Sequence, residues 1–205
     1  MRQSATFAIL FTAMLLGLIG GMAGGIFTLW MRSHDDRALI ADFYAVENAV
    51  HVSPHGLRGK MDKGINDYVL VDLRSQQEYE KEHIVGAINI PAYSDPSTPA
   101  YNQVERIVGQ FSALGDSKPI IMYCYSMPCM TGRKIGKMLA EHGIYVQHLG
   151  IGWNEWRYHW TLWNHELEWK DTKAEDYVAT GKDPGVPQKR TPTVITPCQE
   201  GEFGC

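Results

Sequence analysis

Cys124 and Cys129 are the residues of this chain best suited to covalent chemistry. They stand five positions apart in the segment YCYSMPCM, which begins at Tyr123. A thiolate can attack sulfur, and a second thiol close by can resolve the bond that forms. The spacing therefore predicts a nucleophile and a resolving thiol that exchange persulfide or disulfide. The alternative interpretation is that both are small apolar residues of a site that has lost its activity.

The residues around these cysteines predict a strand, a loop and a helix. An apolar run over Ile120–Cys124 indicates a buried strand, the loop spans Tyr125–Thr131, and the helix begins near Thr131 or Gly132. In α/β folds, ligands bind beyond the carboxyl ends of the strands. The N–H groups at a helix N-terminus stabilise a thiolate or the anionic persulfide made from it.

The other elements of the predicted domain alternate in the same way. Further strands are expected over Val69–Leu73, Ala87–Ile90 and Val146–Leu149, with an acidic helix between the first two. His51-Val52-Ser53-Pro54 predicts a first strand that turns into a helix. Alternating strands and helices predict an α/β fold of three layers, with a central parallel sheet and helices on both faces.

Together these segments resemble the rhodanese-like domain family from about Val50 to Trp156. The resemblance implies a domain over 50–158 that transfers sulfur or carries persulfide, with Cys124 at the catalytic position. The matching residues are Asp72, Arg74, Glu78, Tyr79, His83, Ile84, Gly86, Ala87, Asn89, Pro91, Gly152, Trp153 and Trp156.

The active loop departs from the family pattern Cys-x-x-Gly-x-Arg at two positions. Met127 stands at the glycine and Cys129 at the arginine that helps to bind an anionic donor. Arg133, four residues further on, is the candidate to take over that role, so Cys124, Cys129 and Arg133 are the predicted catalytic residues. Without an arginine in the loop, we expect weak turnover of thiosulfate. Three substitutions elsewhere in the pattern, Glu82, Val85 and Ile151, matter little.

Four polar residues of the matching set are interpreted as structural. Asp72 follows a buried strand and is expected to cap backbone N–H groups. Arg74 and Glu78, at i and i+4, are expected to pair. His83 is expected to make a structural hydrogen bond.

The N-terminal residues 5–31 contain no charged side chain and predict one transmembrane helix. The alternative is a cleaved secretory signal with its cleavage site at Gly21-Met22-Ala23. Either interpretation puts the domain on the periplasmic or extracytoplasmic side. Gly17, Gly21 and Gly24 form part of a small-residue face that predicts packing against a transmembrane partner in the lipid bilayer. The alternative is that glycine is simply common in such helices.

A linker helix is predicted over 32–49, with Ser33 as its cap. Its apolar residues recur at helical spacing, so we expect an amphipathic helix that packs on the domain or on a partner. These residues are Leu39, Phe43, Val46 and Val50.

The C-terminal residues 159–205 predict a Trp-rich helical extension over 159–170 and an extended or disordered tail over 171–205. Trp160 and Trp163 either cover the domain core or face a membrane or a protein partner. His159 and His165 are expected at the surface. In the tail, Cys198 and Cys205 enclose a short loop that a disulfide would close outside the cytoplasm. An alternative for the tail is an arm that lies on a neighbouring subunit.

Composition and charge argue against several classes of function. The 205 residues carry a net charge of −4, with no basic run, phosphate loop or zinc-finger spacing, so we expect no nucleic acid, cofactor or metal. A zinc site that pools the four cysteines fits their spacing poorly. Two hypotheses remain: a membrane-anchored sulfurtransferase that uses a small sulfur donor or acceptor, and an inactive accessory subunit of a membrane complex.

Overall fold

The computed structural model describes residues 2–33 and 35–190 and divides the chain into two units that meet between Ala49 and Val50. The first unit carries α1 (Arg2–Ser33) and α2 (Asp36–Val50). In the described part of the chain, one stretch, Leu10–Met31 of α1, is long and apolar enough to cross a membrane. Ser33 is the last residue of α1, whereas α2 begins at Asp36, where the Asp35 carboxylate accepts the Arg37 N–H at 3.0 Å.

Helix α2 has an apolar stripe with no partner inside its own unit. No residue of the helix is buried, and the side chains of the stripe are about half exposed. Its spacing matches the predicted amphipathic helix. The stripe consists of Leu39, Phe43, Val46 and Val50.

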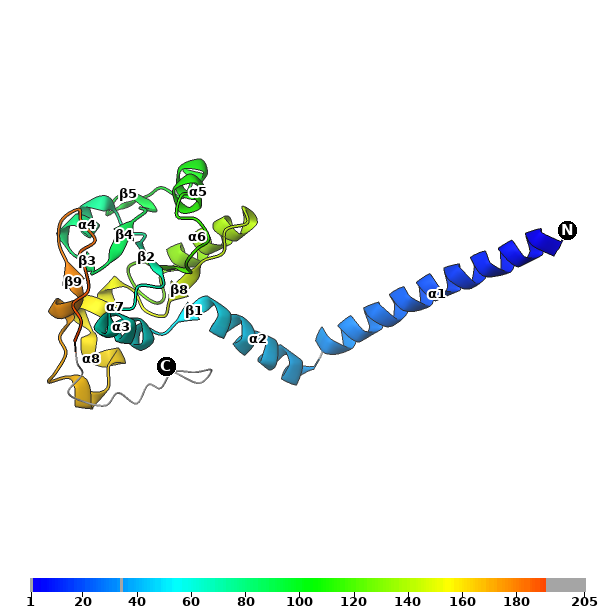
Figure 1. The fold of residues 1–205 in the computed structure, drawn as a ribbon, viewed down its shortest axis with the longest axis horizontal. Coiled ribbons are helices and arrows are strands. Elements are labelled where there is room, and N and C mark those ends of the chain that lie inside the picture. Colours follow the sequence, from blue (N-terminus) through cyan, green and yellow to red (C-terminus); the bar gives the residue numbers. More distant parts are fainter. Residues whose placement is uncertain (1, 34, 191–205) are drawn as a thin grey trace. The chain divides into compact units, whose positions relative to one another are not determined.

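The second unit is built on a five-stranded parallel sheet in the order β1-β8-β7-β2-β4 (Figure 1). This confirms the predicted α/β fold, and each predicted strand is present to within one residue at either end. The strands are β1 (His51–Val52), β2 (Val69–Asp72), β4 (Ala87–Asn89), β7 (Ile120–Tyr123) and β8 (Gln147–Leu149).

Two helices cover each face of the sheet and enclose two separate apolar cores. The first core lies under α3 and α7, and the second lies under α5 and α6. The acidic helix predicted before β4 is present as α4 (Gln76–Lys81). The covering helices are α3 (Pro54–Lys63), α5 (Val104–Ser112), α6 (Met130–Glu141) and α7 (Trp153–Tyr158).

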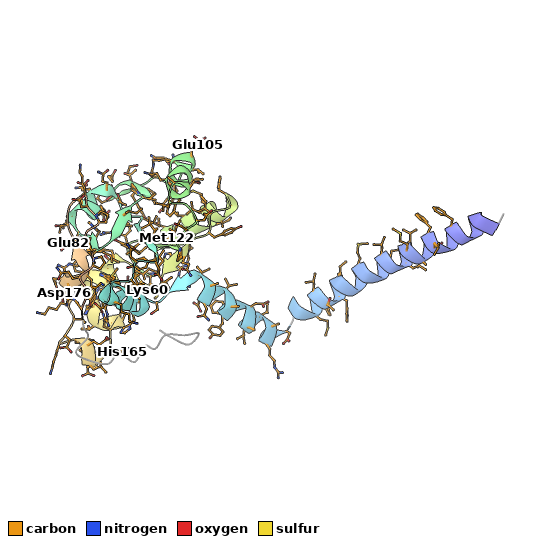
Figure 2. All side chains as sticks on the ribbon, viewed as in Figure 1. Lys60, Glu82, Glu105, Met122, His165 and Asp176 are labelled. Atoms are coloured by element: carbon orange, nitrogen blue, oxygen red, sulfur yellow. The ribbon has the colours of Figure 1, made fainter. Side chains whose placement is uncertain are left out.

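Alternation along β7 determines which core each of its side chains enters. Ile121 and Tyr123 belong to the first core, and Met122 belongs to the second, where Figure 2 places it in the interior of the domain. Side chains two apart on a strand share a face. Cys124, two residues after Met122, therefore lies in the second core as well.

The C-terminal residues as far as Arg190 lie on the domain. Strand β9 (Val178–Ala179), which was not predicted from the sequence, pairs antiparallel with β3 (His83–Ile84). Gly86 N–H also donates to the Pro184 carbonyl at 2.6 Å, which fastens the segment that follows. The remaining elements are β5 (Tyr93–Asp95), β6 (Thr98–Pro99), α8 (Trp160–Trp163) and two 3₁₀ helices, η1 (Glu166–Glu168) and η2 (Ala174–Tyr177).

Two tryptophans of the extension, Trp160 and Trp163, pack in the first core, and the third, Trp169, is 43% exposed. Trp156 is fully buried and stacks on Trp163 with ring centroids 5.0 Å apart, and Trp160 is 8% exposed. The alternative in which Trp160 faces a membrane or a partner is therefore wrong. His159 and His165 are exposed, as predicted.

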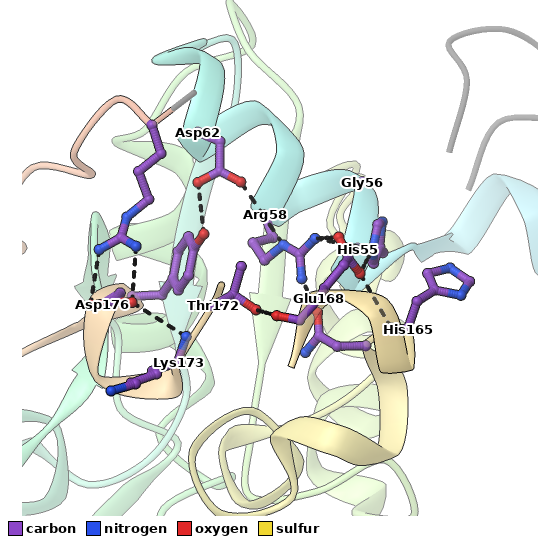
Figure 3. Close-up of polar contacts among 12 residues, drawn as sticks. His55, Gly56, Arg58, Asp62, His165, Glu168, Thr172, Lys173 and Asp176 are labelled. Atoms are coloured by element: carbon purple, nitrogen blue, oxygen red, sulfur yellow. Dashed lines mark hydrogen bonds and ion pairs between the residues drawn. The ribbon is translucent and has the colours of Figure 1, made fainter. Parts of the chain in front are cut away.

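A buried polar network ties the extension to α3 (Figure 3). Arg58 of α3 donates to Glu168 of η1 and to the Asn164 side chain. His55 lies 2.8 Å from the Glu168 carboxylate, and Tyr177 donates to Asp62 at 2.7 Å. These buried charges are paired and hydrogen-bonded, as burial requires. The network fixes the extension in place on the domain.

Candidate active site

The two cysteines lie at either end of the loop between β7 and α6. Cys124 follows the last residue of β7, and Cys129 is the N-cap of α6, which begins at Met130. The Cys129 N–H donates to the Ser126 carbonyl at 3.0 Å, so the loop closes as a tight turn. This arrangement brings both sulfur atoms to the carboxyl end of a central strand.

The start of α7 is fastened to the loop by two backbone hydrogen bonds. The backbone N–H of Trp153 donates to the Cys124 carbonyl at 2.8 Å, and that of Asn154 donates to the Tyr125 carbonyl at 2.8 Å. Gly152 makes this contact close: a Cβ there would lie 2.3 Å from the Ser126 backbone nitrogen. The loop can take its position only because residue 152 has no side chain.

The two sulfur atoms lie 3.3 Å apart, within hydrogen-bond distance. The two side chains differ in access, since Cys124 has no exposed surface and Cys129 is half-buried. Both are free thiols, and neither has a disulfide partner among residues 2–33 and 35–190. Cys198 and Cys205 lie outside the described residues.

A cluster of three hydroxyl groups lies beside the sulfur pair. Thr131 Oγ1 is 2.7 Å from the Tyr93 hydroxyl and 2.7 Å from the Tyr101 hydroxyl, and these two phenols are 3.1 Å apart. The Thr131 hydroxyl also acts to lower the pKa of both cysteine thiols. The phenol of Tyr93 stays protonated because burial raises its pKa. The hydroxyl cluster, Tyr93, Tyr101 and Thr131, therefore places neutral hydrogen-bonding groups beside the sulfur pair.

The electrostatics of the pair place the negative charge on Cys129. The hydrogen bond between the two thiols lowers the pKa of Cys129 to about 5, burial opposes this, and the Thr131 hydroxyl and N–H reinforce it. The pKa of Cys124 is raised because it shares that hydrogen bond and is buried. Either thiol could supply the shared proton. Cys129 carries the charge because it is the more exposed and lies at the positive end of the α6 dipole.

Arg133 makes hydrogen bonds with the backbone of the loop. Its guanidinium donates to the carbonyl oxygens of Met127 at 3.1 Å and of Cys129 at 3.4 Å. It therefore braces the loop, while the side chains of Cys124 and Cys129 are in direct contact with each other. The exposed side of the loop is apolar, with Met127 56% and Met130 55% exposed.

The four polar residues interpreted as structural make structural contacts, but the partner of Arg74 is not the predicted one. Asp72 accepts the Arg74 N–H at 2.8 Å, and the Arg74 guanidinium lies 2.7 Å from the same carboxylate. Arg74 thus pairs with Asp72, and the predicted pair with Glu78 is wrong. Glu78 instead accepts the Tyr125 hydroxyl at 2.5 Å. His83 Nδ1 lies 2.8 Å from the Tyr79 carbonyl, as expected for a structural hydrogen bond.

The hydroxyl cluster was missed by sequence reasoning. Thr131 had a usable signal, because it stands two residues after Cys129 at the predicted helix start. Tyr93 and Tyr101 had none, since they flank the small β5–β6 hairpin some 30 residues before the loop. A hollow of about 700 Å³ between α4 and α5 has Tyr93 on its wall but neither cysteine. In the described residues, no three His, Cys, Asp or Glu side chains gather as a metal site would need.

Comparison with known proteins agrees with this architecture. The Rhodanese-like domain family matches residues 53–159. Among curated proteins, the HTH-type transcriptional regulator Rv0324 of Mycobacterium tuberculosis is 29% identical over 91 residues, which cover 44% of this chain and 35% of that protein. The matched part thus spans about a third of that relative.

Solved structures with this likeness include three bacterial proteins. The BH2092 protein from Bacillus halodurans is 25% identical with a TM-score of 0.49, covering 60% of this chain and 82% of that one. A rhodanese with anions from E. coli is 23% identical with a TM-score of 0.31, covering 42% and 86%. A thiosulfate sulfurtransferase from Pseudomonas aeruginosa is 20% identical with a TM-score of 0.40, covering 53% and 18%.

Proposed function

This chain belongs to the rhodanese-like domain family, and we propose that it is a membrane-anchored carrier that transfers sulfane sulfur through the Cys124–Cys129 pair. The observation that carries the proposal is the 3.3 Å separation of the two free sulfur atoms at the N-terminus of α6. A thiolate is the nucleophile that takes up sulfur, and a low pKa keeps it ionised. The α1 helix attaches this chemistry to a bilayer.

The surroundings of the pair favour a persulfide over thiosulfate as the sulfur donor. Thiosulfate carries two negative charges and needs a cation near the accepting sulfur. Arg133, the predicted candidate, directs one guanidinium nitrogen to two loop carbonyls and not to a sulfur atom. The apolar side chains of Met127 and Met130 are exposed on the same loop. A low-molecular-weight or protein-borne persulfide needs no such cation.

The test is sulfur transfer by the full-length protein in detergent. Radiolabelled persulfide of glutathione and radiolabelled thiosulfate are offered as donors, and transfer to a thiol acceptor is followed. Transfer from the persulfide should exceed that from thiosulfate by at least tenfold, and Cys124→Ser/Cys129→Ser should abolish both. Ser126→Ala, a change in the same loop that leaves both thiols, is the matched control. Equal transfer by the wild type and the double variant would refute the proposal.

A second function, docking into a larger membrane complex, is favoured by the N-terminal unit. A Cβ added at Gly17, Gly21 or Gly24 would meet nothing within 4 Å, so the glycine face of α1 is open to another helix. The apolar stripe of α2 is open as well within that unit. In this proposal the rhodanese-like domain binds and stabilises a transmembrane partner, with or without sulfur chemistry.

Single substitutions in α1 test the docking proposal. Gly21→Leu should weaken co-purification of the partner complex from detergent extracts while leaving the protein in the membrane fraction. Leu16→Ala, off the glycine face, is the control and should not change co-purification. Unchanged association in Gly21→Leu would remove the docking role. Protease digestion of sealed vesicles would show whether the domain lies on the periplasmic side, as we propose.

A further inference from the structure

The family resemblance places sulfur exchange on Cys124, but Cys129 is the more accessible of the two thiols to a donor from solvent. Cys124 has no exposed surface and lies among the side chains of the second core. An attacking thiolate must approach a sulfur–sulfur bond from outside along the line of that bond. Cys129 is half-buried and lies on the solvent side of the pair. Only Cys129 can meet a donor without opening of the loop.

The backbone position of Cys129 also suits a sulfur that carries charge. As the N-cap of α6, it precedes a helix of 12 residues whose first N–H groups have no partner inside the helix. The N–H groups of Thr131 and Tyr125 contribute to the lowered pKa of its thiol. A persulfide on Cys129 would be anionic too and would keep these donors.

The hydroxyl cluster can direct one proton toward the sulfur pair. A threonine hydroxyl has one proton and two acceptor sites. Tyr101 donates to the Tyr93 hydroxyl at 3.1 Å, and Tyr93 can in turn donate to Thr131 Oγ1 at 2.7 Å. In that arrangement the threonine proton is available to Cys129, and such chains of hydrogen bonds reinforce one another.

We propose that Cys129 is the thiol that takes up and hands on sulfur, while buried Cys124 and the hydroxyl cluster position it by donating hydrogen bonds. This assignment rests on the sulfur-transfer function proposed above. The Cys129 thiolate attacks the outer sulfur of a donor R–S–SH, the donor's S–S bond breaks, and R–S⁻ leaves with the electron pair. An acceptor thiolate repeats the step on the Cys129 persulfide, so no external oxidant or reductant is consumed.

Single variants separate the two cysteines. The background is the full-length protein with Cys198→Ser and Cys205→Ser, so that only the site thiols report. Sulfur uptake from glutathione persulfide is followed by peptide mass mapping. Cys129→Ser should lose uptake by roughly 100-fold or more, because a hydroxyl at residue 129 cannot form a persulfide. Cys124→Ser should keep uptake within about tenfold, because serine retains a donor.

A pH profile distinguishes positioning from mere folding. In Cys124→Ala, the midpoint of Cys129 alkylation should rise by roughly 1–2 pH units, as expected when a hydrogen bond to a charged group is lost. Cys124→Ser should restore most of that shift, which a structural defect would not do. Thermal unfolding of each variant reports whether the fold is retained.

The outcomes keep the two proposals apart. If sulfur maps to residue 124 in Cys129→Ser at the wild-type rate, the assignment to Cys129 is wrong but sulfur transfer stands. If neither thiol carries sulfur in the parent protein, the sulfur-transfer function itself fails. Sulfur on residue 129 in Cys124→Ala, with the raised midpoint, supports the assignment.

Discussion

At the scale of single residues, the site depends on which thiol is ionised at neutral pH. The pKa of Cys129 lies at about 5, far below its ordinary value of 9.0, so the thiolate is present at pH 7. Alkylation by iodoacetamide should therefore be constant above about pH 6 and fall as the pH drops through 5. Its rate would instead rise through pH 8 to 9 for an ordinary thiol. Stopped-flow alkylation in the background without Cys198 and Cys205 measures this profile.

The Thr131 hydroxyl can be tested in the same assay. Thr131→Val keeps the size of the side chain and removes its donated hydrogen bond. We expect the alkylation midpoint to rise by about 1 pH unit, which is the effect of losing one hydrogen bond to a charged group. Thr131→Ser keeps the hydroxyl and should restore the profile. An unchanged midpoint in Thr131→Val would show that the hydroxyl does not act on the sulfur.

The short distance between the sulfur atoms predicts ready disulfide formation. Treatment with diamide should lower the intact mass by that of one hydrogen molecule, with no dimer formed. Two thiols already in contact need little backbone movement to reach disulfide geometry. Persistence of both thiols, as read by alkylation, would mean that the loop holds the side chains apart.

At the scale of elements, the contact between α7 and the loop controls the site. In Gly152→Ala the new Cβ would lie 2.3 Å from the Ser126 nitrogen, so the loop must shift. We expect a loss of stability of about 1–3 kcal/mol, typical of overpacking, together with slower alkylation of Cys129. Gly109→Ala in α5 meets nothing within 4 Å and should stabilise by about 0.5–1 kcal/mol. Urea unfolding compares the two, and equal stabilities would contradict the argument.

The network between α3 and η1 predicts a separate effect on stability. Glu168→Gln removes the carboxylate that Arg58 hydrogen-bonds and leaves Asp62, 4.0 Å away, as its remaining charge partner. It should lower the free energy of unfolding by about 1.5–3 kcal/mol, the value of a hydrogen bond to a charged group. Glu166→Gln, exposed in the same short helix, should change it by less than about 0.5 kcal/mol. Equal unfolding midpoints for these two variants would mean that the network does not hold the extension.

Glu168 also makes stability depend on pH. Burial raises the pKa of this carboxyl, but hydrogen bonds from His55 and Arg58 outweigh burial and hold it below its ordinary value of 4.5. A depressed pKa means that the ionised form stabilises the fold above 4.5. That contribution is lost as the pH falls through the lower value of the folded state. It should be missing from Glu168→Gln.

Some of these elements could be predicted from the sequence, and others could not. The apolar runs of β2 and β7 and the five-residue spacing of the cysteines carried enough signal for the sheet and for the sulfur pair. The pairing of β9 with β3 carried none, because strands of two residues show no periodicity. Tyr93 and Tyr101 reach Thr131 through tertiary packing of an irregular segment, which no local pattern encodes.

At the scale of the whole molecule, the chain combines α1, a candidate membrane-spanning helix, with a rhodanese-like domain whose active loop departs from the family pattern. Fractionation should find the full-length protein in the membrane, resistant to carbonate extraction, with α1 retained. An N-terminus that begins after Ala23 would instead show cleavage of a signal. Deletion of residues 2–31 should release a soluble protein whose Cys129 alkylation profile is unchanged, since the domain has its own cores.

The central claim is that the Cys124–Cys129 pair carries sulfane sulfur. Its most direct measurement is the intact mass of the full-length protein in detergent after exposure to glutathione persulfide, followed by peptide mapping. The proposal predicts a species heavier by one sulfur atom, with the added atom on the loop peptide and removable by cyanide. A mass that stays unchanged, with both thiols still free, would contradict the claim.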